Sequence, residues 1–217
     1  MAPRTKFSAA AGTLTAAALL LTACGGGHDK KIASSPTPSD TTASQTTAPP
    51  TTPAADPSAP TFDFPSDFKI VVAPDKTGDP TKDAVLRDQG YAVQAIYLAI
   101  TKLDKTLPVF TKYVTQDASE GWSASIDAGK KDDRSITGTL QIYNRKVTVS
   151  SSTVAAVSFC EDQSAAYDKN LKTGKAVMTT PSITDFVFHT SRMLKGTDGI
   201  WHTTTYNNQK GATQCKR

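Results

Sequence analysis

Few side chains in this sequence carry the chemistry that catalysis or metal binding requires. Beyond His28, the histidines are His189 and His202. A closed zinc site needs about four ligands, typically His and thiolate, so we expect no metal site and no cofactor, although two histidines and a carboxylate could form an open site. The sequence holds no Gly-x-Ser-x-Gly elbow, and the glycines at 25–27 precede no Lys-Ser/Thr, as a phosphate-binding loop would. We therefore predict no catalytic residue and no enzymatic activity.

Cys24 follows Leu21-Thr22-Ala23, and these four residues resemble a lipobox, the cleavage and lipidation motif of bacterial lipoproteins. Before them lie a basic start and a mostly small, apolar run over 9–21, as in a secretory signal. The run is shorter than the ~20 residues of a membrane-spanning helix. We expect cleavage after residue 23, a diacylglycerol (palmitate among its acyl chains) on Cys24, and anchoring on the extracytoplasmic face of the bacterial cell membrane. The alternative is an ordinary secretory signal with an incidental cysteine.

Cys160 and Cys215 remain once Cys24 carries lipid, and they form an even pair in an oxidising, exported compartment. A disulfide between them would close a loop of about 55 residues and stabilise the fold by roughly 4 kcal/mol. The alternative is a reactive thiol. Neither cysteine lies in a Cys-x-x-Cys motif or beside an obvious base, so the sequence favours the disulfide.

The charge pattern argues against a nucleic-acid partner. Removing residues 1–23 takes away Arg4 and Lys6, so the formal net charge falls from +4 to +2. Lys and Arg are dispersed among Asp residues, whereas nucleic-acid binding needs a concentrated basic face. The one dense cluster, over residues 129–134, largely cancels itself and predicts a solvated turn.

Composition divides the mature chain into two parts. Residues 24–61 are mainly Gly, Ser, Thr, Pro, Ala and Asp, which cannot bury enough apolar surface to order the chain. We expect a disordered tether there, with a reach of at most about 120 Å if extended at ~3.1 Å per residue. Its Thr/Pro density would also suit O-glycosylation. Residues 62–217 match the size of one ordinary domain.

Hydrophobic periodicity predicts helices before strands. Asp79-Pro80-Thr81 is a typical helix start, and apolar residues then recur at three- and four-residue intervals for about six turns, ending before Pro108. A shorter amphipathic piece follows over 109–115.

Strands then follow to the end of the chain. We expect them over 135–143, 146–159, 184–194 and 200–206, with turns at Asn144-Arg145 and at Gly196–Gly199. Helices followed by antiparallel strands indicate an α+β fold.

The last strands carry a pattern that resembles actinobacterial secreted lipoproteins. Members read as a strand ending in Cys-x-Asp-x-Ser, a Tyr-Asp turn, a Thr-Gly-Lys, an Asp-Gly-x-Trp and a final cysteine. Here these are Cys160–Ser164, Tyr167-Asp168, Thr173–Lys175, Asp198–Trp201 and Cys215. The resemblance covers about residues 80–217. It implies a nuclear-transport-factor-2-like cone, with one long and one or two short helices packed on a curved, mainly antiparallel sheet, and a bridge between Cys160 and Cys215.

The same resemblance suggests where a site would lie, because isomerases and dehydratases of that superfamily use Asp, His and Tyr inside the cone. We expect His189 and Tyr206 to lie roughly opposite each other on the last hairpin, as a pair on the sheet surface with polar tips in solvent. His202 lies on the same hairpin. Large apolar residues on strands are mostly core, so a pocket role competes with a core role. The residues proposed to line a pocket are Tyr91, Tyr97, Trp122, His189 and Trp201.

These observations favour a non-enzymatic binding or interaction module of the cell envelope. The expected partners are the membrane, through the lipid anchor, and an envelope protein or a small apolar ligand. Two alternatives remain open: a small isomerase or hydro-lyase acting through His189 or a buried Asp, and a scaffold subunit of an envelope or secretion assembly. A cavity with an inward Asp or His would favour the enzyme, and a sealed apolar cone with an exposed apolar patch would favour the scaffold.

Overall fold

The computed structural model describes residues 59–217. The predicted signal sequence, Cys24 and the tether up to residue 58 lie outside the described residues. Within the described part, no helix is long and apolar enough to cross a membrane. The elements are β1 (Phe68–Val72), α1 (Pro80–Lys102), α2 (Pro108–Tyr113), α3 (Gln116–Lys131), β2 (Arg134–Ser151), β3 (Val154–Asn170), β4 (Ala176–Val177), β5 (Phe186–Lys195) and β6 (Trp201–Lys210), with single 3₁₀ turns at Ile183–Asp185 and Thr213–Cys215.

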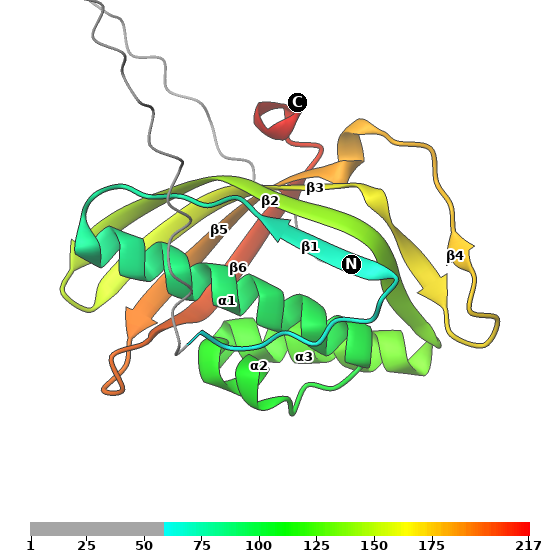
Figure 1. Ribbon diagram of the computed structural model, residues 1–217, viewed down its shortest axis with the longest axis horizontal. Coiled ribbons are helices and arrows are strands. Elements are labelled where there is room, and N and C mark those ends of the chain that lie inside the picture. Colours follow the sequence, from blue (N-terminus) through cyan, green and yellow to red (C-terminus); the bar gives the residue numbers. More distant parts are fainter. Residues whose placement is uncertain (1–58) are drawn as a thin grey trace, which may run out of the picture. The chain divides into compact units, whose positions relative to one another are not determined.

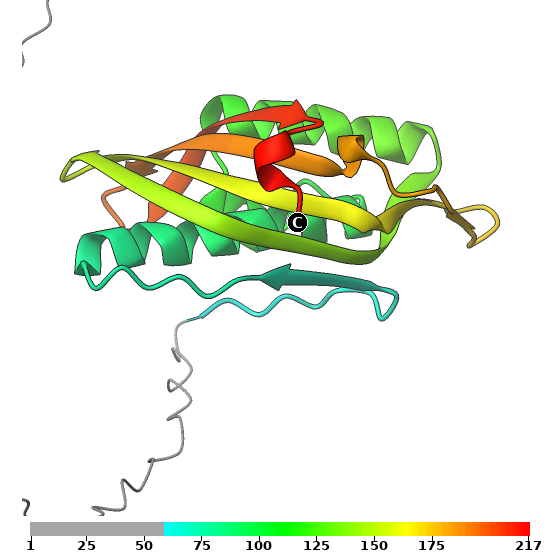
Figure 2. The same cartoon turned by 90° about the horizontal axis from the view of Figure 1, so that it is seen from above.

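The described strands form one curved sheet in the order β1-β2-β3-β5-β6, and the short β4 pairs with the far end of β3. β1 runs parallel to β2, and the other pairs are antiparallel. The three helices cover one face of the sheet, while the C-terminal turn lies on the other face (Figures 1 and 2). The predicted α+β cone, with one long and two shorter helices on a mainly antiparallel sheet, is confirmed.

The long helix begins where the sequence predicts. The side chain of Asp79 accepts hydrogen bonds from the backbone N–H groups of Thr81 and Lys82, and Pro80 needs no such partner. The helix ends at Leu103, whose positive φ of 49° closes the last turn. The predicted helix is therefore confirmed, and it lies along the concave face of the sheet.

Two local predictions need correction. The segment over residues 129–134 does contain the predicted turn, at Asp132 and Asp133, but its other residues are the end of α3 and the start of β2. We had not predicted α3, because only Ala118, Ile126 and Gly129 along it are buried and the apolar stripe is weak. Asn144 and Arg145 form a bulge inside the continuous strand β2, and the hairpin turn comes later, at Ser151–Val154.

The bulge has a structural purpose. It directs the Arg145 side chain onto α1, where the guanidinium donates to the carbonyl oxygen of Leu86 (2.7 Å), to Gln89 and to Asp75 (2.8 Å). Gly90 makes room for it, because a Cβ at this position would lie 3.1 Å from an Arg145 nitrogen. A buried arginine is stable only with its N–H groups paired, so the bulge joins α1 to the sheet.

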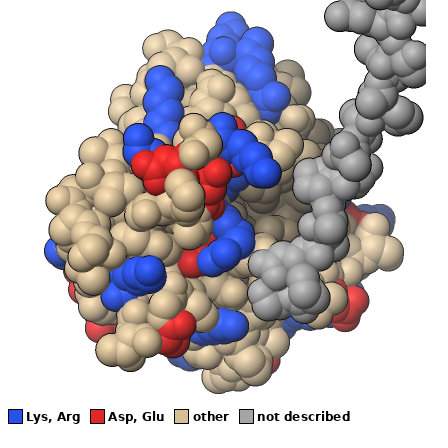
Figure 3. Space-filling view, turned by 60° about the vertical axis from the view of Figure 1, so that its left-hand side comes forward, with Lys and Arg blue, Asp and Glu red and all other residues tan. Residues whose placement is uncertain are grey.

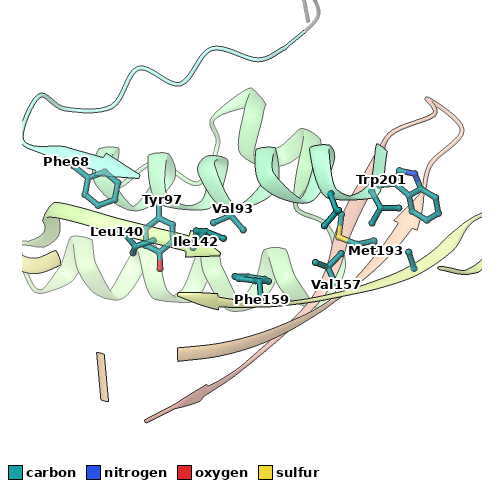
Figure 4. Close-up of a cluster of buried hydrophobic side chains, with 12 residues drawn as sticks. Phe68, Val93, Tyr97, Leu140, Ile142, Val157, Phe159, Met193 and Trp201 are labelled. Atoms are coloured by element: carbon teal, nitrogen blue, oxygen red, sulfur yellow. The ribbon is translucent and has the colours of Figure 1, made fainter. Parts of the chain in front are cut away.

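The main core lies between α1 and the sheet (Figure 4). Its fully buried members include Phe159, Met193 and Trp201, each 1% exposed or less. The backbone N–H of Trp201 donates to the buried carboxylate of Asp88 on α1 (2.9 Å), which ties β6 to the helix. A fully buried hydrophobic side chain contributes about 1.5–3 kcal/mol, so this cluster holds the cone together.

The disulfide between Cys160 and Cys215 is confirmed, with the two Cα atoms 5.4 Å apart. Phe159 faces the main core, so Cys160, the next residue along the strand, faces the opposite side of the sheet. There it packs in a small cluster with Tyr143 and Ala212. The bridge therefore fastens the C-terminal turn to the outer face of β3.

On the face shown in Figure 3, Lys and Arg side chains stand beside Asp and Glu rather than forming one basic patch.

Candidate functional site

A cavity of about 340 Å³ opens between the helices and the concave face of the sheet. Its exposed rim carries charged residues, Arg134, Asp168 and Lys210. Its inner end carries buried polar residues, Tyr97, Glu161 and His189. The apolar wall between them is formed by Ile100, Leu103, Trp122, Ile126, Ile136 and Val187.

Strand alternation places the carboxylate at the inner end of this cavity. Phe159, Glu161 and Gln163 have the same parity on β3, so they share the concave face, whereas Cys160 points outward into the disulfide. On β5, His189 pairs directly with Phe159 and therefore stands beside Glu161. Tyr97 approaches from α1 and completes the cluster.

Glu161 is fully buried and is surrounded by hydrogen-bond donors. The hydroxyl of Tyr97 donates to Oε2 of Glu161 at 2.8 Å, and the side-chain amide of Gln163 donates to Oε1. The Nε2 atom of His189 lies 3.5 Å from the same Oε2. Such donors are what a buried carboxylate needs, because an uncompensated charge in the interior is very costly.

The two tyrosines near Glu161 remain hydrogen-bond donors at neutral pH. Burial raises the pKa of the Tyr97 hydroxyl well above its ordinary value, and the charge on Glu161 raises it further. Burial and Glu161 raise the pKa of Tyr206 in the same way. A phenol that keeps its proton can donate to a carboxylate, a carbonyl or a hydroxyl oxygen.

His189 and Tyr206 hold unused hydrogen-bonding capacity. Within residues 59–217, neither ring nitrogen of His189 nor the hydroxyl of Tyr206 has a hydrogen-bond partner, although all three atoms are buried. The 3.5 Å between Nε2 of His189 and Oε2 of Glu161 is longer than the 2.7–3.2 Å of a usual hydrogen bond, so this contact leaves the ring nitrogen without a partner. The ring of His189 stacks on Phe159, with centroids 4.8 Å apart. Buried polar atoms are rarely left unpaired, so these groups have capacity for a ligand or a bound water.

The expectation of a surface His–Tyr pair was wrong. The two rings do lie close, with centroids 5.0 Å apart, but His189 is only 3% exposed. His189 lies opposite Asn208, and Tyr206 lies opposite Ser191, two residues away from the expected pairing. One residue of this displacement arises because the ladder begins with Lys195 opposite Trp201, and the other arises at the register shift between Arg192 and Met193. The rings are buried because α1 and α3 cover this face of the sheet.

The proposed pocket residues lie in three different places. Tyr97, Trp122 and His189 line the cavity described above. Tyr91 lines a different depression of about 640 Å³, between α1 and the segment after β1. Trp201 is buried in the main core. His202 contacts the carbonyl oxygen of Lys112 (2.7 Å) and Asp198, outside the cavity.

Glu161 and Gln163 were not predicted as site residues from the sequence. The signal was available, because Ala155, Val157 and Phe159 establish an apolar inward face and Glu161 continues it with the same parity. A carboxylate at a core-facing position is rarely fully buried without a partner or a function. Among residues 59–217, no group of three or more His, Cys, Asp or Glu is arranged to hold a metal ion.

We expect His189→Gln to lower the free energy of unfolding by about 1–3 kcal/mol, because it disturbs a buried, stacked ring beside a carboxylate. Urea unfolding measures this loss. Thr190→Ala is the matched control, because the neighbouring side chain is exposed on the opposite face and should change stability by about 0.5 kcal/mol or less. A loss for His189→Gln as small as the control's would show that the ring is not held as described.

No known protein family matches this chain, and no curated protein matches it. Among solved structures, it is similar to a ketosteroid isomerase-like protein from Erwinia carotovora atroseptica SCRI1043, with 15% identity, a TM-score of 0.42, and coverage of 61% of this chain and 97% of the other.

Two further structures show likenesses of the same kind. A scytalone dehydratase candidate from Novosphingobium aromaticivorans DSM 12444 has 10% identity, a TM-score of 0.41 and coverage of 60% and 86%. An NTF-2 like protein of unknown function from Shewanella oneidensis MR-1 has 16% identity, a TM-score of 0.35 and coverage of 56% and 95%. The fold class stands on the strand order and helix packing above, and these likenesses carry nothing about activity.

Proposed function

We propose that this chain is a lipid-anchored lipoprotein of the bacterial cell envelope and that its cone cavity binds a small organic molecule. One observation carries the binding proposal: the inner end of an open cavity combines a buried carboxylate, Glu161, with polar atoms of His189 that have no hydrogen-bond partner among the described residues. Apolar walls with a few convergent polar groups are typical of small-molecule sites.

The cavity's chemistry defines the class of ligand. Its volume of about 340 Å³ lies at the lower end of the range for ligand pockets. The apolar wall around Trp122 suits a mainly hydrocarbon or aromatic body. The Glu161–His189 end suits a hydroxyl or carbonyl group. The oxygen of either group can accept a hydrogen bond from an imidazole N–H and can lie beside a tyrosine hydroxyl. We therefore propose a compact, largely apolar molecule with one or two such polar groups.

Native mass spectrometry of the protein purified from its host tests this proposal. We expect a retained small molecule that is released on unfolding and is identified from its mass. The proposal would be contradicted if the purified protein held no small molecule and also bound none from an extract of the host envelope.

The anchor is supported by the Leu21–Cys24 motif, the secretory signal before it and the resemblance to actinobacterial secreted lipoproteins. We expect Cys24→Ser to block lipidation and to leave the precursor uncleaved by the lipoprotein signal peptidase, because the thiol is the acceptor of diacylglycerol. Mass spectrometry of the membrane fraction measures both effects. Cys24→Ser protein that still carries diacylglycerol would rule out Cys24 as the anchor.

An isomerase or hydro-lyase is the second candidate, and the same cluster supports it. A carboxylate 3.5 Å from an imidazole can act as a general acid–base pair, with Glu161 accepting a proton from a C–H group and His189 donating one to a leaving or acceptor oxygen. Turnover of the identified ligand, abolished by Glu161→Gln while binding persists, would establish the enzyme. Binding of the ligand without turnover would support the binding module and exclude the enzyme for that ligand. A scaffold has less support, because the cone is open rather than sealed.

A further inference from the structure

The segment between β3 and β5 gathers the exposed apolar side chains of the domain. We call residues 171–183 the β4 arm. Among residues 59–217, the large apolar residues with substantial exposure are Val71 and four members of this arm: Leu171, Val177, Met178 and Ile183. Met178 is 69% exposed and Val177 is 55% exposed. Apolar residues concentrated in this way on one segment mark an interaction site more often than chance exposure does.

The arm is weakly attached to the domain. β4 is two residues long, and its ladder consists of Ala176 opposite Lys169 and Val177 opposite Asp168. In Figure 1 the arm lies at the end of the sheet away from the β5–β6 turn. No core cluster of the described residues includes Val177 or Met178. Val177 and Met178 therefore lie outside the packed core of the domain.

The charged side chains of the β4 arm itself are lysines, Lys172 and Lys175. Between residues 169 and 184 the chain carries Lys169, Lys172 and Lys175 and no Asp or Glu. Lys169 and Lys172 pair with Asp67 and Asp133 at the base of the arm, each at 2.7 Å. Lys175, next to Ala176 and Val177, forms no ion pair among the described residues. Exposed apolar side chains beside lysines are the combination that binds at an anionic lipid surface.

The arm is also adjacent to the opening of the cavity. Asp168 lines the cavity rim and pairs with Val177 of the arm. Arg134, on the same rim, contacts Asp168 at 3.2 Å. Whatever surface the arm contacts is therefore brought next to the route by which a ligand enters.

We infer that the β4 arm is a membrane-contact site: Val177 and Met178 enter the headgroup region of an anionic bilayer, Lys175 contacts lipid phosphates, and the cavity opening is thereby turned toward the membrane. This inference goes beyond the proposed ligand binding. It requires neither the anchor on Cys24 nor a ligand, although an anchored domain would have a bilayer within reach of its tether. A bilayer is favoured over a protein partner because the apolar residues lie on a thin arm with lysines and no carboxylates, rather than on a broad complementary face.

Flotation with lipid vesicles tests the inference on residues 24–217 with Cys24→Ser, so that no lipid anchor contributes. We expect binding to phosphatidylglycerol–phosphatidylcholine vesicles and little binding to phosphatidylcholine alone. The double variant Val177→Ser/Met178→Ser should bind at least about tenfold more weakly, because each exposed side chain loses apolar area that the bilayer would bury. Lys175→Gln should bind about fivefold more weakly, with less salt dependence.

Val71→Ser is the matched control, because Val71 is an exposed apolar residue of β1 outside the arm and its replacement should leave vesicle binding unchanged. Thermal unfolding of each variant verifies that the fold persists. Absence of binding to anionic vesicles, or equal binding by the double variant, would overturn the inference. Self-association that Val177→Ser/Met178→Ser abolishes, without vesicle binding, would assign the arm to a second copy of the chain instead.

Discussion

Replacing Cys160 and Cys215 together with serine is expected to lower the free energy of unfolding by about 4 kcal/mol. The bridge spans 55 residues, so its loss restores a large loop entropy to the unfolded chain. The folded chain also loses the tie between β3 and the C-terminal turn, where both cysteines are buried. Urea unfolding of the oxidised protein and of the double variant measures the difference. A loss below about 1 kcal/mol would show that the bridge contributes little.

The disulfide lies next to the cavity residue Glu161 along β3. Cys160 and Glu161 are consecutive on β3 and point to opposite faces, so the disulfide anchors the strand that carries the buried carboxylate. Wild-type protein in reductant serves as the control, because it removes the bond without changing a side chain. It should lose stability to a similar extent, and a variant that lost far more would reveal a packing effect of the two serines.

Ala166→Phe is expected to abolish retention of the cavity ligand. Ala166 lines the cavity, because a register shift between Asp162 and Ala165 reverses the alternation of β3 after Gln163. A phenyl ring at this position would project into the cavity and narrow it. Native mass spectrometry should find the variant without the molecule that the wild type retains. Thermal unfolding accompanies the measurement, because overpacking costs about 1–3 kcal/mol where the ring does not fit.

Ala165→Phe is the matched control for this prediction. Ala165 is exposed and has the opposite parity on the same strand, so it adds the same ring outside the cavity. It should retain the ligand as the wild type does. Retention by Ala166→Phe in folded protein would place the ligand somewhere other than this cavity.

Local signals explain why much of the fold could be predicted. Asp79 and Pro80 are strong helix-start residues, and the apolar residues that follow them recur at the three- and four-residue intervals of a helix. The turn at Gly196–Gly199 is equally specific, and it joins β5 to β6 as expected. The helix α3 was missed because its buried side consists mainly of small residues. The bulge at Asn144 was taken for a turn because both use a residue with positive φ, here 51°.

The candidate site was harder to predict because it depends on contacts between distant parts of the chain. Tyr97 and Glu161 are 64 residues apart, and neither signals the other in the sequence. His189 looked like a surface residue because the strand alone does not reveal that helices cover it. The two-residue displacement of β6 then decides what lies opposite His189, and such displacements arise from turn geometry and backbone irregularities that composition does not encode.

The most direct test of the central claim follows the indole N–H signals of the two tryptophans by NMR as the recovered ligand is added back to ligand-free protein. Trp122 lines the cavity, whereas Trp201 is 1% exposed in the main core. Binding in the cavity predicts that the Trp122 signal moves in a saturable way and that the Trp201 signal stays in place. A saturable shift of Trp201 with Trp122 unmoved, or no shift of either, would contradict ligand binding in the cone.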